Sequence, residues 1–373
     1  MINMKGENMS FLQTFAEEKN IKHSTYRGYH DTVKIYTKVI GKPMPALIKE
    51  ADDEEEEGIR WKNRKLKKHL NKFTTYLEEN YRLSSINIHL TRIKAIYKYK
   101  EIEIGEIRPI NKKNVEISEP ISYADLPDKE IIKKALKISD PLMRAVIVFM
   151  ASSGCSRTET LSLTVQDYIN ATSDYHNSND INDVINELEN TDDVIPMFKI
   201  KRIKTNKYYY AFCSPEAVQE INNYLLTRES LKKEDKLFDI ISNYLNTKFR
   251  MINDTLKLGN SGTYGVFRPH MLRKFFASNM VKSGLPMETV NTLEGRTKGN
   301  VNESYFFDDP YELKQKYADH MDAVLINWDF EKITVESPEV KKIMSENQKL
   351  KKQNTEITKL KKRFKELEGM FDL

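Results

Sequence analysis

The chain has 373 residues, 31% of them charged, and a formal net charge of +5 at neutral pH. This length predicts two domains with extra segments, and a charge this weak does not by itself identify a nucleic-acid-binding protein. No apolar run reaches the length of a membrane span, and the N-terminus lacks the apolar core of a signal peptide. Cys155 and Cys213 are too few for a disulfide framework or a zinc site, so we expect a soluble, cytoplasmic protein.

Residues 1–108 predict a small helical domain. Apolar residues recur at steps of three and four along three segments. These stripes are Tyr26, Tyr29, Val33, Tyr36 and Ile40; then Leu66, Leu70, Phe73 and Leu77; then Ile86, Leu90, Ile93 and Tyr97. Basic residues cover the rest of the third helix: Arg92, Lys94, Lys98 and Lys100. Such a face either contacts DNA phosphates or is an ordinary solvated surface, and the segment alone favours neither.

Two further segments are interpreted from composition. Residues 52–57 are six consecutive acids, which we interpret as a solvated loop or a helix start, because a run of carboxylates does not converge on a metal ion. Residues 109–128 hold three prolines with little periodicity and predict a linker between domains.

Residues 129–330 predict a larger, mostly helical domain. Near its start, Gly154 permits a sharp turn, and Arg157 then lies where a helix begins and its amides favour an anion. The alternative is that Arg157 pairs with Glu159 or another nearby acid. Further on, residues 196–203 and 208–212 are rich in strand-forming side chains and predict a hairpin, with Lys204 at its tip. A lysine there can reach a phosphate or protonate a leaving oxygen.

The stretch 268–276 contains an H-x-x-R pair on a helix predicted to begin near Pro269. His270 and Arg273 are three residues apart and therefore share a helix face. Arginine matches phosphate oxygens with its planar fork, and histidine exchanges protons near neutral pH. For an isolated pair, a core histidine beside a surface arginine is the better interpretation, so support must come from other motifs.

Those motifs follow one another in a fixed order: Arg157, the hairpin Lys204, His270-x-Leu-Arg273, Gly295-Arg296 and Tyr305. This order resembles the tyrosine recombinases, or phage-type integrases, especially their archaeal branch. The resemblance implies a mainly α fold with a small β-hairpin or sheet, in which a helical, SAM-like core-binding domain precedes an α+β catalytic domain. It also implies an enzyme of an archaeal virus or mobile element that integrates or recombines DNA at specific sites.

Site roles carry over position by position from the resemblance. Arg157 is implied to be the first catalytic arginine, although the family commonly reads Gly-x-Arg and this chain has one more residue after Gly154. Lys204 is implied to be the hairpin lysine, with His270 and Arg273 as the central pair. Arg296 falls where the family has His or Trp, and this replacement removes a titratable proton carrier.

The implied nucleophile is Tyr305, nine residues after Arg296. Tyr311 and Tyr317 are the competing candidates, but Asp309 and Pro310 predict a helix start, which places Tyr311 in its first turn and Tyr317 on its apolar side. Attack on a DNA phosphate would give a 3′-phosphotyrosyl link and a free 5′-hydroxyl without a metal or other cofactor. The partner implied is double-stranded DNA, with a homotetramer acting on two sites and no membrane.

Residues 331–373 predict an amphipathic C-terminal helix. Apolar residues recur every seven positions: Ile343, Leu350, Ile357, Phe364 and Phe371. The pattern favours a coiled coil and self-association, and a single helix folded back on its own domain is nearly as good an interpretation. Two other functions remain open: a type IB topoisomerase that relaxes DNA through the same chemistry, and a non-catalytic DNA-binding regulator on the same fold.

Overall fold

A computed structural model describes residues 4–116, 122–296 and 309–326 of the chain. Contacts divide the chain into two compact units, Met1–Pro120 and Ile121–Leu373. Each unit has its own apolar core. Among the described residues, no helix is both long and apolar enough to cross a membrane.

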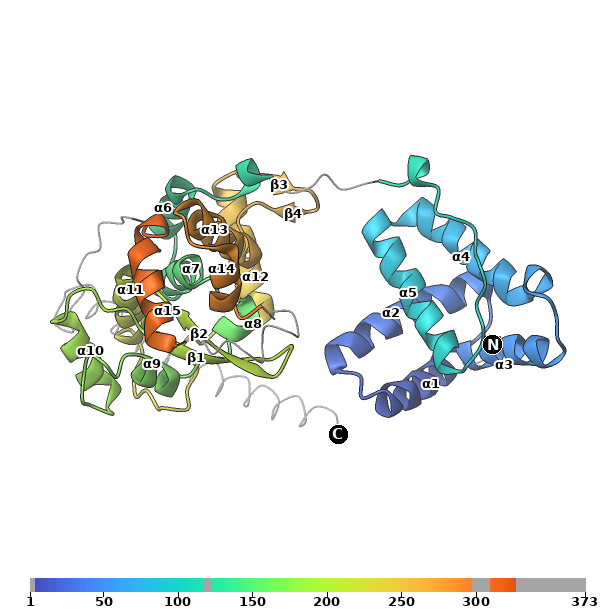
Figure 1. Cartoon of the computed structure of the whole chain (residues 1–373), viewed down its shortest axis with the longest axis horizontal. Helices are drawn as coiled ribbons and strands as arrows, with labels where there is room; N and C mark the ends of the chain where they lie inside the picture. The colour runs from blue at the N-terminus through green and yellow to red at the C-terminus, as the bar shows by residue number, and fades with distance from the viewer. Residues whose placement is uncertain (1–3, 117–121, 297–308, 327–373) are drawn as a thin grey trace, which may run out of the picture. The chain divides into compact units, whose positions relative to one another are not determined.

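Unit 1 consists of five helices and a trailing segment (Figure 1). The helices are α1 (Met4–Glu18), α2 (His23–Ile40), α3 (Met44–Glu56), α4 (Lys65–Asn80) and α5 (Leu83–Tyr99). The predicted stripes of α4 and α5 are buried throughout, and Val33 and Tyr36 bury the centre of α2. The trailing segment also contacts this core, because Ile102 and Val115 are buried in it.

Two predictions for unit 1 are corrected. The acidic run does not form a loop or a helix start, because it falls at the C-terminal end of α3, where buried Glu54 accepts hydrogen bonds from the backbone N–H of Lys65. Arg92 does not lie free on the surface of α5. Its Nη1 donates to the Gly28 carbonyl at 3.0 Å and ties α5 to α2, and a Cβ on Gly28 would meet this guanidinium at 2.3 Å.

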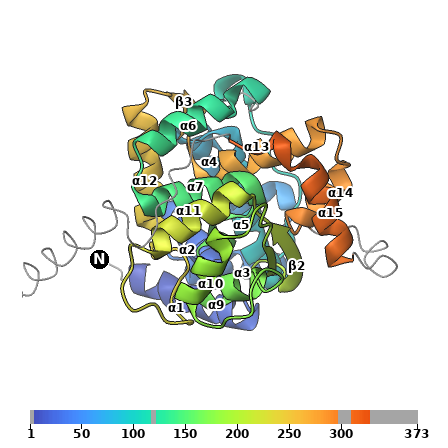
Figure 2. The ribbon, with the colours of Figure 1, turned by 90° about the vertical axis from the view of Figure 1, so that its left-hand side faces the viewer.

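Unit 2 is organised around one buried helix, α7 (Pro141–Ser153), whose residues from Ala145 to Ser153 are all buried. Figure 2 shows α11 running alongside α7, and α13 also contacts it. Four helices of this unit begin at a proline, which suits the first helical position because its missing N–H needs no partner there. The α-helices of the unit besides α7 are α6 (Lys129–Lys137), α8 (Arg157–Thr160), α9 (Val165–Ala171), α10 (Ile181–Glu189), α11 (Pro215–Leu225), α12 (Ser242–Thr255), α13 (Pro269–Lys282), α14 (Met287–Leu293) and α15 (Pro310–His320).

The predicted hairpin is confirmed. Strands β1 (Met197–Arg202) and β2 (Lys207–Phe212) pair antiparallel, with Met197 opposite Phe212 and Arg202 opposite Lys207. A second, very short hairpin pairs β3 (Asn260–Ser261) with β4 (Tyr264–Gly265). The described residues are thus mainly helical with two small two-stranded sheets, which confirms the expected fold class. The domain limits proposed from the sequence, 1–108, 109–128, 129–330 and 331–373, stay predictions, and the C-terminal coiled coil lies outside the described residues.

Candidate active site

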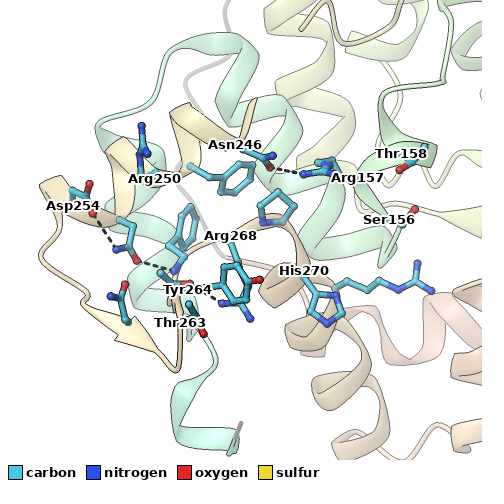
Figure 3. Close-up of a pocket in the computed structure, with 17 residues that line it drawn as sticks. Ser156, Arg157, Thr158, Asn246, Arg250, Asp254, Thr263, Tyr264, Arg268 and His270 are labelled. Carbon is cyan, nitrogen blue, oxygen red and sulfur yellow. Dashed lines mark hydrogen bonds between the residues drawn. The ribbon is translucent and has the colours of Figure 1, made fainter. Parts of the chain in front are cut away.

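A pocket with a volume of about 770 Å³ opens in unit 2 and contains three of the residues singled out from the sequence (Figure 3). Arg157 lines it from α8, and His270 and Arg273 line it from α13. The remaining wall comes from α12 and from the β3–β4 hairpin, so residues about a hundred positions apart in sequence meet here.

Arg157 is placed by the turn that joins α7 to α8. Gly154 ends α7 with a left-handed backbone (φ 64°), and Ser156 then caps α8 in a capping box with Glu159, so that α8 begins at Arg157. The Nη1 of Arg157 donates to Oδ1 of Asn246 at 2.6 Å (Figure 3). The alternative pairing with Glu159 is therefore wrong for this structure, since no carboxylate within the described ranges lies within salt-bridge distance of Arg157.

Arg273 is buried and held on several sides. Its Nη1 donates to the Gly154 carbonyl and its Nη2 to the Glu294 carbonyl, both at 2.8 Å. Its Nε lies 3.1 Å from the Glu294 carboxylate, and its Nη1 lies 3.7 Å from that of Glu159. Glu159 also accepts a hydrogen bond from the Tyr209 hydroxyl at 3.1 Å. The backbone and two acids thus fix the orientation of this guanidinium.

Arg296 follows the turn that ends α14. The Arg296 N–H donates to the Asn291 carbonyl at 2.8 Å, and Gly295 adopts a left-handed backbone (φ 63°) that closes the turn. The Nε of Arg296 lies 2.6 Å from the Glu294 carboxylate. Glu294 therefore contacts both Arg273 and Arg296, two of the predicted site residues.

His270 lies exposed at the rim of the pocket, which overturns the alternative of a core histidine. Partial burial lowers its pKa from the usual 6.5, and the positive charges of Lys274, Arg268, Arg273 and Arg296 lower it further. An imidazole among cations stays neutral at physiological pH, and a neutral imidazole can accept a proton.

Arg268 is a site residue that the sequence interpretation missed as such. Its guanidinium lies over the Tyr264 ring, 5.1 Å from the centroid, and its Nη1 donates to the Gly265 carbonyl at 3.1 Å. In the part of the chain that the structure describes, no carboxylate neutralises it. Its position two residues before His270 could have identified Arg268 from the sequence. Nothing in the sequence indicated Asn246.

The other two predicted site residues, Lys204 and Tyr305, are not among the described residues that line the pocket. Lys204 is exposed in the turn between β1 and β2, as predicted. Tyr305 lies outside the described residues. Among its competitors, Tyr317 is fully buried and its hydroxyl donates to the Ser152 carbonyl at 2.9 Å, while Tyr311 is 59% exposed in the first turn of α15. The core position predicted for Tyr317 is confirmed.

The pocket is positively charged where a ligand would enter. Arg157 and Arg268 have no acidic partner within the described ranges, whereas Arg273 pairs with Glu159 and Glu294. Arg296, which does not line the pocket, pairs with Glu294. Guanidinium groups without acidic partners favour a phosphate ligand. Within the same ranges, no cluster of His, Cys, Asp or Glu could hold a metal ion.

Residues 128–309, which include this pocket, match the phage integrase family. With the site geometry above, the match defines the class of protein: an enzyme that cuts and rejoins DNA strands, a site-specific recombinase. The chain carries a phage integrase domain, the domain of the tyrosine recombinases.

Several solved structures are similar to this chain. The integrase of transposon Tn1549, in complex with a circular intermediate DNA, is 13% identical to this chain, covers 83% of it and 98% of its own chain, and has a TM-score of 0.51. The XerH site-specific recombinase bound to a palindromic difH substrate is 17% identical over 82% of each chain, with a TM-score of 0.46. The XerA recombinase is 16% identical over 85% of this chain and 98% of its own, with a TM-score of 0.34. Among curated proteins, none matches.

Proposed function

We propose that this recombinase cuts double-stranded DNA with Tyr305, which attacks the scissile phosphate and forms a 3′-phosphotyrosyl link while the 5′-hydroxyl leaves. A hydroxyl from a second strand then attacks that link, so the bond energy is kept and no cofactor is consumed. The observation that carries the proposal is the convergence of Arg157, His270 and Arg273 in one positively charged pocket of the phage integrase domain.

The proposed roles follow from the charge and protonation of each group. Arg157, Arg273 and Arg296 stabilise the charge that develops on the phosphate oxygens in the pentavalent transition state. His270, whose pKa is lowered by burial and by its cationic neighbours, accepts the proton of the tyrosine hydroxyl. Lys204 protonates the leaving 5′-oxygen. Since Arg296 replaces a titratable residue, proton transfer depends on His270 and Lys204.

Several finer assignments belong to the same proposal. We infer an archaeal-type branch of the family, a homotetramer acting on two DNA sites, self-association through residues 331–373 and a cytoplasmic location. The DNA complexes of the Tn1549 integrase and of XerH support double-stranded DNA as the partner. Unit 1, with its basic helix surfaces, is proposed to bind the DNA core next to the cut.

The alternatives are less well supported. A topoisomerase would need the same tyrosine chemistry, but the family match is to integrases. A non-catalytic regulator would not need a cationic pocket around a histidine of lowered pKa. A topoisomerase would also relax supercoiled DNA without a specific site, which a relaxation assay on plasmid DNA tests directly.

The test is capture of the covalent intermediate. The full chain is incubated with a nicked half-site duplex built on repeats that flank its gene, and the protein–DNA adduct is resolved on a denaturing gel. We expect an adduct with the wild type and none with Tyr305→Phe, because the phenylalanine ring has no hydroxyl to attack phosphorus. The matched control is Tyr311→Phe, which removes an exposed hydroxyl from the first turn of α15 and should leave the adduct unchanged.

Two results would contradict this function. Lack of an adduct with the wild type on its own site argues against catalysis, and an adduct with Tyr305→Phe shows that another residue is the nucleophile. Loss of the adduct with Tyr311→Phe alone would assign the attack to Tyr311.

A further inference from the structure

Glu294 is a fully buried acid, with 0% of its surface exposed, at the point where two arginines of the proposed site meet. One carboxylate oxygen lies 3.1 Å from Nε of Arg273 and the other lies 2.6 Å from Nε of Arg296. These two contacts are ion pairs, and the hydrogen bond that Arg273 donates to Glu294 is made at the Glu294 backbone carbonyl, which accepts from Nη2 at 2.8 Å.

Because Glu294 contacts each arginine at Nε, the terminal nitrogens are the part of the guanidinium that can face a ligand. A guanidinium has five N–H donors, and only one of them is on Nε. Arg296 keeps about half of its side chain exposed, and the contact that the structure shows between it and the Glu294 carboxylate is made by Nε, at 2.6 Å. Glu294 therefore holds Arg296 from behind and leaves its fork of terminal donors open for a ligand, the geometry that binds phosphate oxygens in pairs.

The turn that carries Glu294 is itself fixed. Gly295 needs its left-handed backbone, and a Cβ there would come within 2.5 Å of the Tyr209 ring. The Gly295 carbonyl accepts a hydrogen bond from Nη1 of Arg202, the last residue of β1. The carboxylate of Glu294 thus approaches the two arginines from a rigid position, which is the requirement for a group that orients others.

Stability alone does not explain a buried carboxylate here. Burial raises the pKa of Glu294, which means that the protein environment disfavours its charge, and Arg273, Arg296 and Arg202 only partly offset this effect. Buried ion pairs contribute little net stability relative to apolar residues of the same size. What such a pair supplies is a defined geometry.

We propose that Glu294 is a positioning residue, whose carboxylate fixes Arg273 and Arg296 through their Nε atoms so that the terminal nitrogens of Arg296 meet the nonbridging oxygens of the scissile phosphate. The inference rests on the proposed function. It predicts that Glu294 acts on the chemical step, because Arg296 is needed most where charge develops, in the transition state.

The test compares rate with affinity in the full chain. Adduct formation is measured in a single turnover at saturating protein, and the dissociation constant for an intact site is measured by fluorescence anisotropy. Glu294→Gln keeps the shape and removes the charge, and we expect the rate to fall about 10–100-fold, by analogy with residues that orient the ligands of a metal site. The dissociation constant should change less than about threefold, because the substitution removes no group that touches DNA. The control, Glu288→Gln, makes the same change at an exposed position of α14 and should alter neither quantity.

A double-mutant cycle then asks whether Glu294 acts through Arg296. In an Arg296→Ala background, we expect Glu294→Gln to lower the rate at most about threefold further, because the group to be oriented is already absent. An equal loss in both backgrounds overturns the proposal, as does an unchanged rate in Glu294→Gln alone.

Two precautions keep the outcome interpretable. Circular dichroism melting shows whether each variant is folded, and if Glu294→Gln is not, Glu294→Asp takes its place. Its carboxylate keeps the charge but is one methylene too short to reach both Nε atoms, so the rate should still fall, and a wild-type rate overturns the proposal. Failure of the proposed function can be told apart from failure of the Glu294 proposal, because in that case the wild type itself forms no adduct.

Discussion

At the scale of single residues, the histidine of the site is tuned by its neighbours. Partial burial and four cations lower the pKa of His270, with Lys274 the largest of the charge effects. Because the imidazole is the group that must be neutral to accept a proton, activity should persist to lower pH than an unperturbed histidine would allow, and should fall as the pH drops through a pKa below 6.5.

This leads to a prediction about Lys274. Replacing it with glutamine removes one positive charge near His270, so the pKa of His270 should move back toward 6.5. The acid limb of the pH–rate profile for adduct formation should then shift to higher pH. Lys282→Gln removes a lysine from the other end of α13, whose charge is not among those acting on His270, and should leave the limb in place. A limb that does not move with Lys274→Gln would mean that another group accepts the proton.

At the scale of elements, the glycine between α7 and α8 determines how the helices around the site pack. Gly154 has a left-handed backbone, a Cβ there would meet the Phe276 ring at 2.3 Å, and its carbonyl receives Nη1 of Arg273. One residue thus ends the central helix, lets α13 approach closely and anchors an arginine.

Two alanine substitutions separate these effects. Gly262 has nearly the same backbone conformation (φ 63°, against 64° at Gly154), but a Cβ there would meet nothing within 4 Å. Gly262→Ala should therefore lower the free energy of unfolding only by the left-handed strain, about 1–2 kcal/mol. Gly154→Ala should cost about 1–3 kcal/mol more, because Phe276 must shift. Urea denaturation followed by circular dichroism measures both, and equal losses would show that contact with Phe276 is not limiting.

The elements that the sequence predicts best are those with a clear period or a clear start. The stripes of α4 and α5, the proline starts of α13 and α15 and the hairpin are confirmed. Helix α3 was not predicted because the run of acids interrupts the apolar pattern of its buried face. That face is formed by Leu47 and Ala51 together with Glu54. The acid at position 54 is buried only because it caps the start of α4, and a contact of that kind is not visible in a local pattern.

The same limit applies to the site. His270 and Arg273 are close in sequence and lie on one helix, so their common face was predictable. Asn246 lies 89 positions from Arg157, and the contact between them depends on how α12 packs in the unit. Glu294 stands next to Gly295 and Arg296 in sequence, but nothing local indicates that it is buried between two arginines.

At the scale of the whole molecule, the chain has two separate apolar cores, one in each unit. Every described residue of the candidate pocket belongs to unit 2. The site and the predicted DNA-binding surface of unit 1 are therefore built from independently packed parts.

A fragment that begins at residue 121 should test this division. Because unit 2 has its own core, the fragment should unfold cooperatively and still form the covalent adduct at saturating protein. Its affinity for DNA should fall, and the slope of affinity against salt should become shallower, because the phosphate contacts proposed for unit 1 are lost. Anisotropy titrations at several salt concentrations measure both. A fragment with the salt slope of the full chain would show that unit 1 contributes no phosphate contacts.

The ring of Tyr209 has a consequence for protein engineering. Tyr209 lies in the strand that follows the Lys204 turn, its ring fills the space beside Gly295, and its hydroxyl reaches Glu159. The β1–β2 hairpin therefore cannot be exchanged for that of another protein without affecting the rest of the site. A chimera that takes its hairpin from another recombinase must also carry an aromatic ring at this position and a hydrogen-bond donor equivalent to Arg202. Without them, the turn that carries Arg296 loses the contacts that hold it in place.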